Sequence, residues 1–188
     1  MNITSAKFLK GIVGTDPILL DPIPQFAFVG RSNVGKSSLI NCLLNTKDLV
    51  KSGKKPGKTQ QINFFLVNRN MYFVDLPGYG FSEVKFTKRE KFSKLIQWYL
   101  LEPILKRKIV LVLDARIKPS DLDLEMYRIL IENQLEVIIA ANKIDVLTQK
   151  EAHANIKILT EAFPYSIIIP CSAKTKVGRE EILRNLLK

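Results

Sequence analysis

One short segment of the chain combines glycines, a lysine and serines at a spacing that suits phosphate binding. It reads Gly30-x-x-x-x-Gly35-Lys36-Ser37, and it stands between an apolar segment and a helical one. Glycines let the backbone curl so that several N–H groups face one anion, and the helix adds the positive end of its dipole. We expect Lys36 to reach the β- and γ-phosphates and the Ser37 hydroxyl to bind Mg²⁺. The residues assigned to phosphate binding are Gly30, Arg31, Ser32, Asn33, Val34, Gly35, Lys36, Ser37 and Ser38.

A second motif, Asp75-Leu76-Pro77-Gly78, ends a later hydrophobic segment. Such a turn is common by itself, but after a phosphate loop it predicts that Asp75 holds Mg²⁺ through a water molecule. The Gly78 N–H can then face the γ-phosphate, where a side chain would block the approach. A glutamine after this glycine could orient the attacking water, but this chain has Tyr79 there. We therefore expect slow unaided turnover, on the order of 10⁻⁴–10⁻² s⁻¹.

Two further motifs predict that the base of the nucleotide is guanine. In Asn142-Lys143-Ile144-Asp145, the Asp145 carboxylate can accept both guanine N1–H and N2–H₂, a pair that adenine lacks. Asn142 can bond the far edge of the purine, and the Lys143 stem can lie over the ring. A site built for this paired contact favours GTP over ATP. Cys171-Ser172-Ala173 follows the last expected strand, where small residues allow a backbone N–H to approach the guanine carbonyl oxygen.

The segment 46–60 has no periodicity and is rich in lysine and glycine. A loop of this length in a compact domain is usually functional. Thr59 could close over Mg²⁺ with its hydroxyl and touch the γ-phosphate with its N–H, an ordering that hydrolysis would release. The alternative is an ordinary surface threonine. The nucleotide contacts that we assign to this loop are Gly57, Lys58, Thr59, Gln60 and Gln61, and the catalytic groups are Lys36, Thr59 and Gly78.

Strands and helices alternate along the chain around these motifs. We expect strands at 25–29, 61–67, 71–75, 109–114, 137–141 and 166–170, and helices at 36–44, 88–106, 119–132, 149–163 and 177–187. The segments 61–67 and 71–75 read as an antiparallel hairpin, and 3–9 is a candidate additional edge strand. This order predicts an α/β, three-layer P-loop NTPase fold. Its mostly parallel six-stranded sheet would have one antiparallel edge strand and helices on both faces.

Composition limits the class of protein. The 188 residues fit one domain, which we assign to GTP binding over 1–188. No apolar run reaches the roughly 20 residues that span a bilayer, and residues 1–10 lack a secretory pattern. The two cysteines, Cys42 and Cys171, suit a reducing cytoplasm and read as buried apolar residues without a disulfide or metal.

The net charge of +11 is unevenly distributed. Residues 1–108 carry 18 basic and 7 acidic side chains, whereas residues 109–188 carry 11 of each. The surplus gathers in the segments 47–58, 85–94 and 106–108. A clustered basic surface indicates a polyanionic partner such as RNA or an acidic membrane, and the alternative is a merely solubilising surface.

With these motifs in this order, the chain resembles the translation-factor-related GTPases, and most of all the EngB (YihA/YsxC) family of bacterial ribosome-assembly GTPases. The narrower resemblance rests on 30–41, on Lys55-Pro-Gly-Lys-Thr-Gln60 with Ile62-Asn-Phe-Phe65, and on Asp75-Leu-Pro-Gly-Tyr-Gly80. It implies a role in late assembly of the large ribosomal subunit, and through that role a link to cell division and septation. In some related GTPases an asparagine at the Asn33 position helps to bind K⁺, so Asn33 is a candidate K⁺ ligand.

Three hypotheses about function follow. In the first, the protein is a switch that docks on a large-subunit precursor with GTP and leaves after hydrolysis. In the second, it is a nucleotide-gated module that binds rRNA or ribosomal protein, and hydrolysis is incidental. In the third, the basic face meets acidic lipid, although no amphipathic anchor or lipidation motif is visible. We expect a cytoplasmic monomer without stable membrane association.

Overall fold

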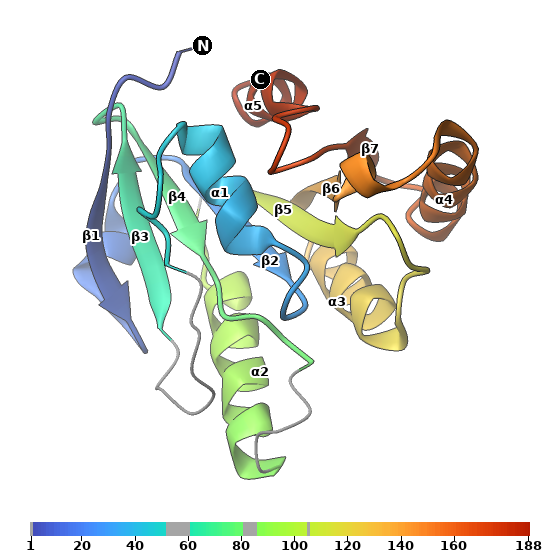
Figure 1. Ribbon diagram of the computed structural model, residues 1–188. Helices are drawn as coiled ribbons and strands as arrows, with labels where there is room; N and C mark the ends of the chain where they lie inside the picture. The colour runs from blue at the N-terminus through green and yellow to red at the C-terminus, as the bar shows by residue number, and fades with distance from the viewer. Residues whose placement is uncertain (1, 52–60, 81–85, 105) are drawn as a thin grey trace.

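The computed structural model describes residues 2–51, 61–80, 86–104 and 106–188, and for 86–93 it describes the backbone alone. Seven strands form one sheet in the order β1-β3-β4-β2-β5-β6-β7 (Figure 1). The strands are β1 (Ala6–Ile12), β2 (Gln25–Gly30), β3 (Ile62–Val67), β4 (Met71–Asp75), β5 (Arg107–Asp114), β6 (Glu136–Asn142) and β7 (Ile167–Pro170). The helices are α1 (Lys36–Leu44), α2 (Phe86–Leu101), α3 (Asp121–Glu132), α4 (Gln149–Ala162) and α5 (Arg179–Leu186), with short 3₁₀ turns η1 (Pro17–Leu20) and η2 (Ile144–Val146).

Helices cover both faces of the sheet, so the fold has three layers. Along β2, Phe26 and Phe28 belong to the core that α1 and α5 complete. Ala27 and Val29 belong to the opposite core, which includes side chains of α2, α3 and α4. Because successive strand residues point to opposite faces, a strand buried on both sides is apolar at nearly every position. This confirms the predicted α/β P-loop fold class.

The sheet has one strand more than we expected, and the antiparallel strand is not at its edge. β3 runs antiparallel to β4, as the hairpin predicts, but β1 pairs with the outer side of β3. β1 spans Ala6–Ile12 rather than 3–9, and its register shifts between Phe8 and Lys10. Residues 7–10 of β1 are exposed, and apolar and polar residues do not alternate regularly along the strand. The sequence pattern therefore marks β1 only weakly.

Helix α2 ends earlier than its periodicity suggests. Residues 88–106 were expected to be helical, but α2 ends at Leu101. Pro103 explains the difference, because proline removes a backbone donor and disfavours helical geometry in the residue before it. Ile96, Tyr99 and Leu100 of α2 are buried.

The early end of α2 gives Arg107 a structural role that contradicts its assignment to the basic surface. Arg107 is only 7% exposed. Its guanidinium donates to the carbonyl oxygens of Leu100 at 2.8 Å and Glu102 at 2.9 Å, and it lies 4.4 Å from the centre of the Tyr99 ring. A charged donor at the C-terminus of a helix satisfies carbonyls that have no partner in the helix. The segment 106–108 therefore presents less positive charge to a partner than its sequence suggests.

None of the helices in the described part of the chain combines the length and apolar character that crossing a lipid bilayer requires.

Replacing Arg107 with alanine should lower the free energy of unfolding by about 3 kcal/mol, because two inward carbonyls would lose a charged donor. The neighbouring Lys106, which has the same charge and is exposed, is the matched control. Its alanine variant should stay within about 0.5 kcal/mol of the parent. Urea denaturation followed by fluorescence of the single tryptophan, Trp98, measures both. Equal losses in the two variants would contradict the structural role of Arg107.

Candidate nucleotide-binding site

The motifs 30–37, 75–78, 142–145 and 171–173, which the structure describes, lie at one edge of the sheet, where the parallel strands end. β4, β2, β5, β6 and β7 are mutually parallel, so their carboxyl ends share this edge (Figure 1). Ligands of open α/β sheets bind outside these carboxyl ends. The fold thus brings together motifs that are more than a hundred residues apart, as the 108-residue separation of the hydrogen-bonded Val34 and Asn142 shows.

The predicted phosphate loop connects β2 to α1. Gly35 precedes the first residue of α1 and has φ +93°, a left-handed conformation that a side chain would strain. A Cβ at Gly30 would come 2.5 Å from the Val112 carbonyl oxygen, so this position also needs glycine. Ser37 and Ser38 lie in the first turn of α1. The loop therefore places the N-terminus of a helix behind a glycine-rich turn, the arrangement that binds phosphate.

The segment 75–78 packs directly against the phosphate loop. The Lys36 ammonium pairs with the Asp75 carboxylate, and both side chains are about nine-tenths buried. A Cβ at Gly78 would lie 2.9 Å from Ser32 Oγ. The Ser32 N–H donates to the Tyr79 carbonyl oxygen at 2.9 Å. Lys36, Asp75 and Gly78 thus share one location. Leu76 and Pro77 of the same segment are buried.

Tyr79 is oriented toward α3. Its hydroxyl donates to the Asp123 carboxylate at 2.8 Å, and Asp123 also accepts from the backbone N–H of Ser120 at 2.9 Å. Burial raises the pKa of the Tyr79 phenol, and the Asp123 carboxylate raises it further. The phenol is therefore a neutral donor in this contact. Through this hydrogen bond to Asp123, Tyr79 links the loop after Gly78 to α3.

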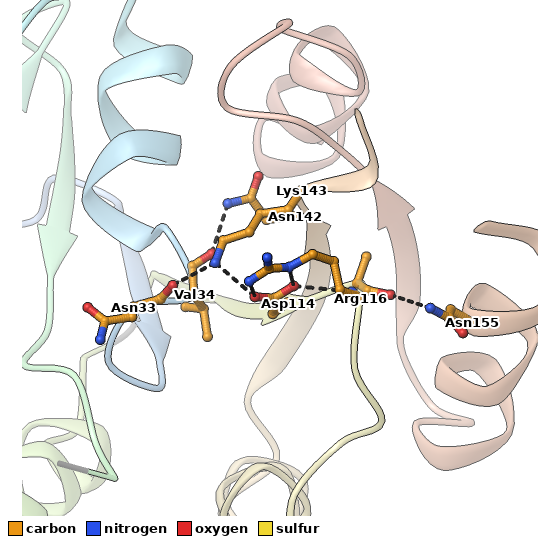
Figure 2. Close-up of polar contacts among 8 residues, drawn as sticks. Asn33, Val34, Asp114, Arg116, Asn142, Lys143 and Asn155 are labelled. Carbon is orange, nitrogen blue, oxygen red and sulfur yellow. Dashed lines mark hydrogen bonds and ion pairs between the residues drawn. The ribbon is translucent and has the colours of Figure 1, made fainter. Parts of the chain in front are cut away.

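Asn142 joins three loops from inside the protein. The side chain is 2% exposed. Its Nδ2 donates to the Val34 carbonyl oxygen at 2.9 Å, and its Oδ1 accepts from the Ala173 N–H at 3.0 Å. Asn142 therefore braces two loops, and Figure 2 shows its bond to the Val34 carbonyl oxygen. Its Nδ2 carries a second N–H, so the expected bond to the far edge of the purine stays a prediction.

Lys143 crosses from the end of β6 to the phosphate loop. Its ammonium donates to the Asn33 carbonyl oxygen at 2.7 Å and to Asp114 Oδ2 at 2.8 Å (Figure 2). Ile144 donates its N–H to the Cys171 carbonyl oxygen at 3.1 Å, which orders the turn η2. Asp145 lies in η2 and is exposed, as a carboxylate must be to receive a base.

The residues 171–173 follow β7 and are held by their own backbone contacts. Cys171 donates its N–H to the Ala141 carbonyl oxygen at 2.8 Å. Ser172 Oγ accepts from the N–H groups of Lys174 at 3.2 Å and Thr175 at 3.0 Å.

Cys42 and Cys171 are both free and buried, as predicted. Burial, followed by the nearby Cys42, raises the pKa of the Cys171 thiol to about 12, so this thiol stays protonated at neutral pH.

The loop predicted to sense the γ-phosphate is only partly described. Gly57, Lys58, Thr59 and Gln60 lie outside the described residues, so their assignment stays a prediction. Gln61 is exposed and precedes β3.

Sequence reasoning missed one residue of the site, Asp114, and the exposed Arg116 side chain that pairs with it from outside the site. Asp114 ends β5 and is 8% exposed, and Arg116 donates to it from Nε at 2.9 Å and from Nη2 at 2.7 Å. Burial alone would raise the pKa of this carboxyl, but hydrogen bonds from Arg116 and Lys143 outweigh it and hold the pKa at about 2. The available signal was an aspartate at the carboxyl end of a buried strand, with an arginine two residues later.

Comparison with known proteins shows which proteins this chain is similar to. A family model described as 50S ribosome-binding GTPase matches residues 25–143. A protein of Clostridium kluyveri named "Probable GTP-binding protein EngB" is 40% identical over 99% of this chain and 96% of its own length. A protein of Geobacillus with the same name is 39% identical over 96% of this chain and 95% of its own.

Solved structures of GTP-binding proteins are also similar to this chain. A crystal structure of a probable GTP-binding protein engB superimposes with a TM-score of 0.73 and 29% identity, covering 87% of this chain and 96% of its own. The structure of Era in complex with MgGDPNP and nucleotides 1506–1542 of 16S ribosomal RNA has a TM-score of 0.70 and 25% identity, and the match covers 87% of this chain and 55% of Era.

The low pKa of Asp114 predicts a pH-dependent contribution to stability. The folded-state pKa, about 2, lies below the ordinary value of 3.8, so the contribution is present above pH 4 and is lost as the pH falls toward 2. At about 1.4 kcal/mol per pKa unit, it amounts to about 2 kcal/mol. Asp114→Asn should therefore be less stable than the parent at pH 6, and the gap should narrow as pH falls from 4 to 3. Urea denaturation at each pH measures it, and a constant gap would contradict the assignment.

Proposed function

The chain belongs to the EngB family of GTP-binding proteins and hydrolyses GTP, and from this we propose that it is a nucleotide-dependent switch in large ribosomal subunit assembly. The observation that carries the proposal is the match of residues 25–143 to the family described as 50S ribosome-binding GTPase. That range contains the phosphate loop, the Asp75 segment and Asn142–Lys143.

We assign GTP binding to groups at the carboxyl edge of the sheet. Backbone N–H groups of residues 30–37 and the N-terminus of α1 would hold the phosphates. Lys36 would leave Asp75 for the β- and γ-phosphates. The Ser37 hydroxyl and the Asp75 carboxylate supply the oxygen donors that Mg²⁺ prefers, so these residues fit the ion. When bound, Mg²⁺ would neutralise phosphate charge.

We assign guanine recognition to Asp145, which is exposed and follows directly on the loop that Asn142 braces. A carboxylate at this point would accept both edge donors of guanine. Lys143 would place its stem against the base, because its ammonium is anchored beyond it on the phosphate loop. Residues 171–173 would close the other side of the base, held at their place by Asn142.

The protein's slow step would be hydrolysis. The Tyr79 hydroxyl binds Asp123, so this side chain supports our expectation that the usual water-orienting role is unfilled. Gly78 and Thr59 would position the γ-phosphate, and Asn33 is the proposed K⁺ ligand. Its side chain extends away from the Lys143 contact made by its carbonyl (Figure 2).

We propose an rRNA-rich surface of the large-subunit precursor as the partner. Lys47, Lys51 and Lys94 are exposed, and they belong to the two basic segments next to the nucleotide-sensing loops. Positive charge there would favour a polyanion. Ribosome assembly takes place in the cytoplasm, so we propose that the protein acts there. We also propose that it acts as a monomer. Its effect on cell division and septation would follow from ribosome supply.

Sedimentation with purified large ribosomal subunits tests the switch. We expect binding to be about tenfold tighter with a non-hydrolysable GTP analogue than with GDP, a typical coupling between two sites. Lys36→Ala should lose this nucleotide dependence. Lys150→Ala is the control, because Lys150 has the same charge and is exposed on α4, away from the basic segments.

Each alternative has its own outcome in this experiment. Equal binding with GTP analogue and GDP, unchanged by Lys36→Ala, would overturn the switch and support a binding module with incidental hydrolysis. Binding to acidic liposomes but not to subunits would overturn the ribosomal role.

Turnover in K⁺ and Na⁺ buffers tests the role of Asn33. If Asn33 binds K⁺, GTP hydrolysis should be several-fold faster in K⁺, because a cation beside the phosphates neutralises charge developing in the transition state. The Asn33→Ala variant should lose this difference. Equal hydrolysis rates of the parent protein in the two buffers would refute K⁺ binding by Asn33.

A further inference from the structure

The carboxylate of Asp114 is the most heavily hydrogen-bonded group at the edge of the sheet, and none of the motifs accounts for it. Asp114 ends β5 and pairs in register with Asn142 at the end of β6. Ala115 donates its N–H to the Asn142 carbonyl oxygen at 2.8 Å. The carboxylate is therefore fixed beside the loop assigned to the base.

Two basic side chains converge on this carboxylate from opposite directions (Figure 2). Arg116 donates to it from Nε and Nη2, and its backbone N–H donates to Oδ1 at 3.1 Å. Lys143 donates to Oδ2 at 2.8 Å. The two partners differ in exposure, because the Arg116 side chain is 48% exposed and that of Lys143 only 27%. Arg116 braces the turn after β5, whereas Lys143 reaches inward.

Lys143 is held at its far end by this contact. Its ammonium also donates to the Asn33 carbonyl oxygen, and its Cε lies 3.8 Å from the ideal Cβ position of Gly35. The stem is therefore stretched across the phosphate loop. A lysine left unpaired would sample many rotamers, and ordering it on ligand binding would reduce affinity.

We propose that Asp114 is a positioning residue for the guanine nucleotide, which holds Lys143 across the phosphate loop before the nucleotide binds. This inference rests on the proposed placement of the base against Lys143 and Asp145. Asp114 itself does not touch the nucleotide. Its loss frees the Lys143 ammonium from one of its two anchors, and the bound nucleotide dissociates faster.

A double-mutant cycle separates positioning from a general effect on the fold. Affinity for a fluorescent GDP analogue is measured for the parent, Asp114→Asn, Lys143→Ala and the double variant. Asp114→Asn should weaken binding about tenfold, the effect expected from one charge-assisted hydrogen bond. In the Lys143→Ala background the same change should have little further effect, because the positioned group is gone.

Two features of the experiment distinguish a positioning role from a loss of stability or a simple change of charge. Asp114→Asn removes a negative charge near the phosphates, so a simple Coulombic effect would tighten binding rather than weaken it. Arg116→Gln removes the other partner of the same carboxylate and leaves Lys143 paired, so its affinity should stay within about twofold of the parent. Unfolding curves and the bound fraction at saturation establish that each variant is folded.

The outcomes distinguish this inference from the site assignment. If the parent protein fails to bind the GDP analogue, the nucleotide site itself is refuted. If the parent binds and Asp114→Asn binds equally well, only the positioning role is refuted. It is refuted too if Asp114→Asn costs the same factor with and without Lys143, or if Arg116→Gln costs as much as Asp114→Asn.

Discussion

The buried amide of Asn142 is the interaction on which the arrangement of the site depends. A single side chain binds the phosphate loop through Val34 and the loop after β7 through Ala173, while its own backbone ends β6. A buried amide must have both its donor and its acceptor satisfied, so the two loops cannot move apart without leaving polar groups unpaired. The loops that we assign to the base and to the phosphates are therefore positioned as one unit.

A second constraint couples this unit to the segment expected to respond to the γ-phosphate. The Tyr79 backbone contacts the phosphate loop, and its phenol binds Asp123 near the start of α3. Asp123 also closes the capping box of α3 with Ser120. The loop after β4 thus lies between two rigid elements. Through the Tyr79–Asp123 contact, a displacement of Gly78 would shift the N-terminus of α3. The segment that joins Asp114 to α3 is attached to the same helix end.

Much of the fold could be predicted because motif and periodicity agree. The strand ends that place Gly30, Asp75 and Asn142 at one edge follow from buried apolar runs, and the boundaries of α1 and β4 were correct. The errors have physical causes. Pro103 ends α2 although the apolar spacing continues, and β1 lacks a clear alternation because its outer positions are exposed. The roles of Asn142 and Arg107 depend on which atoms lie within reach across the fold. Sequence spacing gives no such distances, so Arg107 was counted as surface charge and the bracing role of Asn142 was not foreseen.

The position of β1 has a consequence for how the sheet could pair with another chain. β3, which spans Ile62–Val67, is almost wholly apolar and would be a hydrophobic edge if β1 did not cover it. Among the described strands β1 is the edge strand on this side, and it carries Lys7 and Lys10. Charged residues on an edge strand discourage a further chain from adding to the sheet. The N-terminal strand therefore protects the hairpin that carries Asp75 from intermolecular β-pairing, at the opposite end of the sheet from β7.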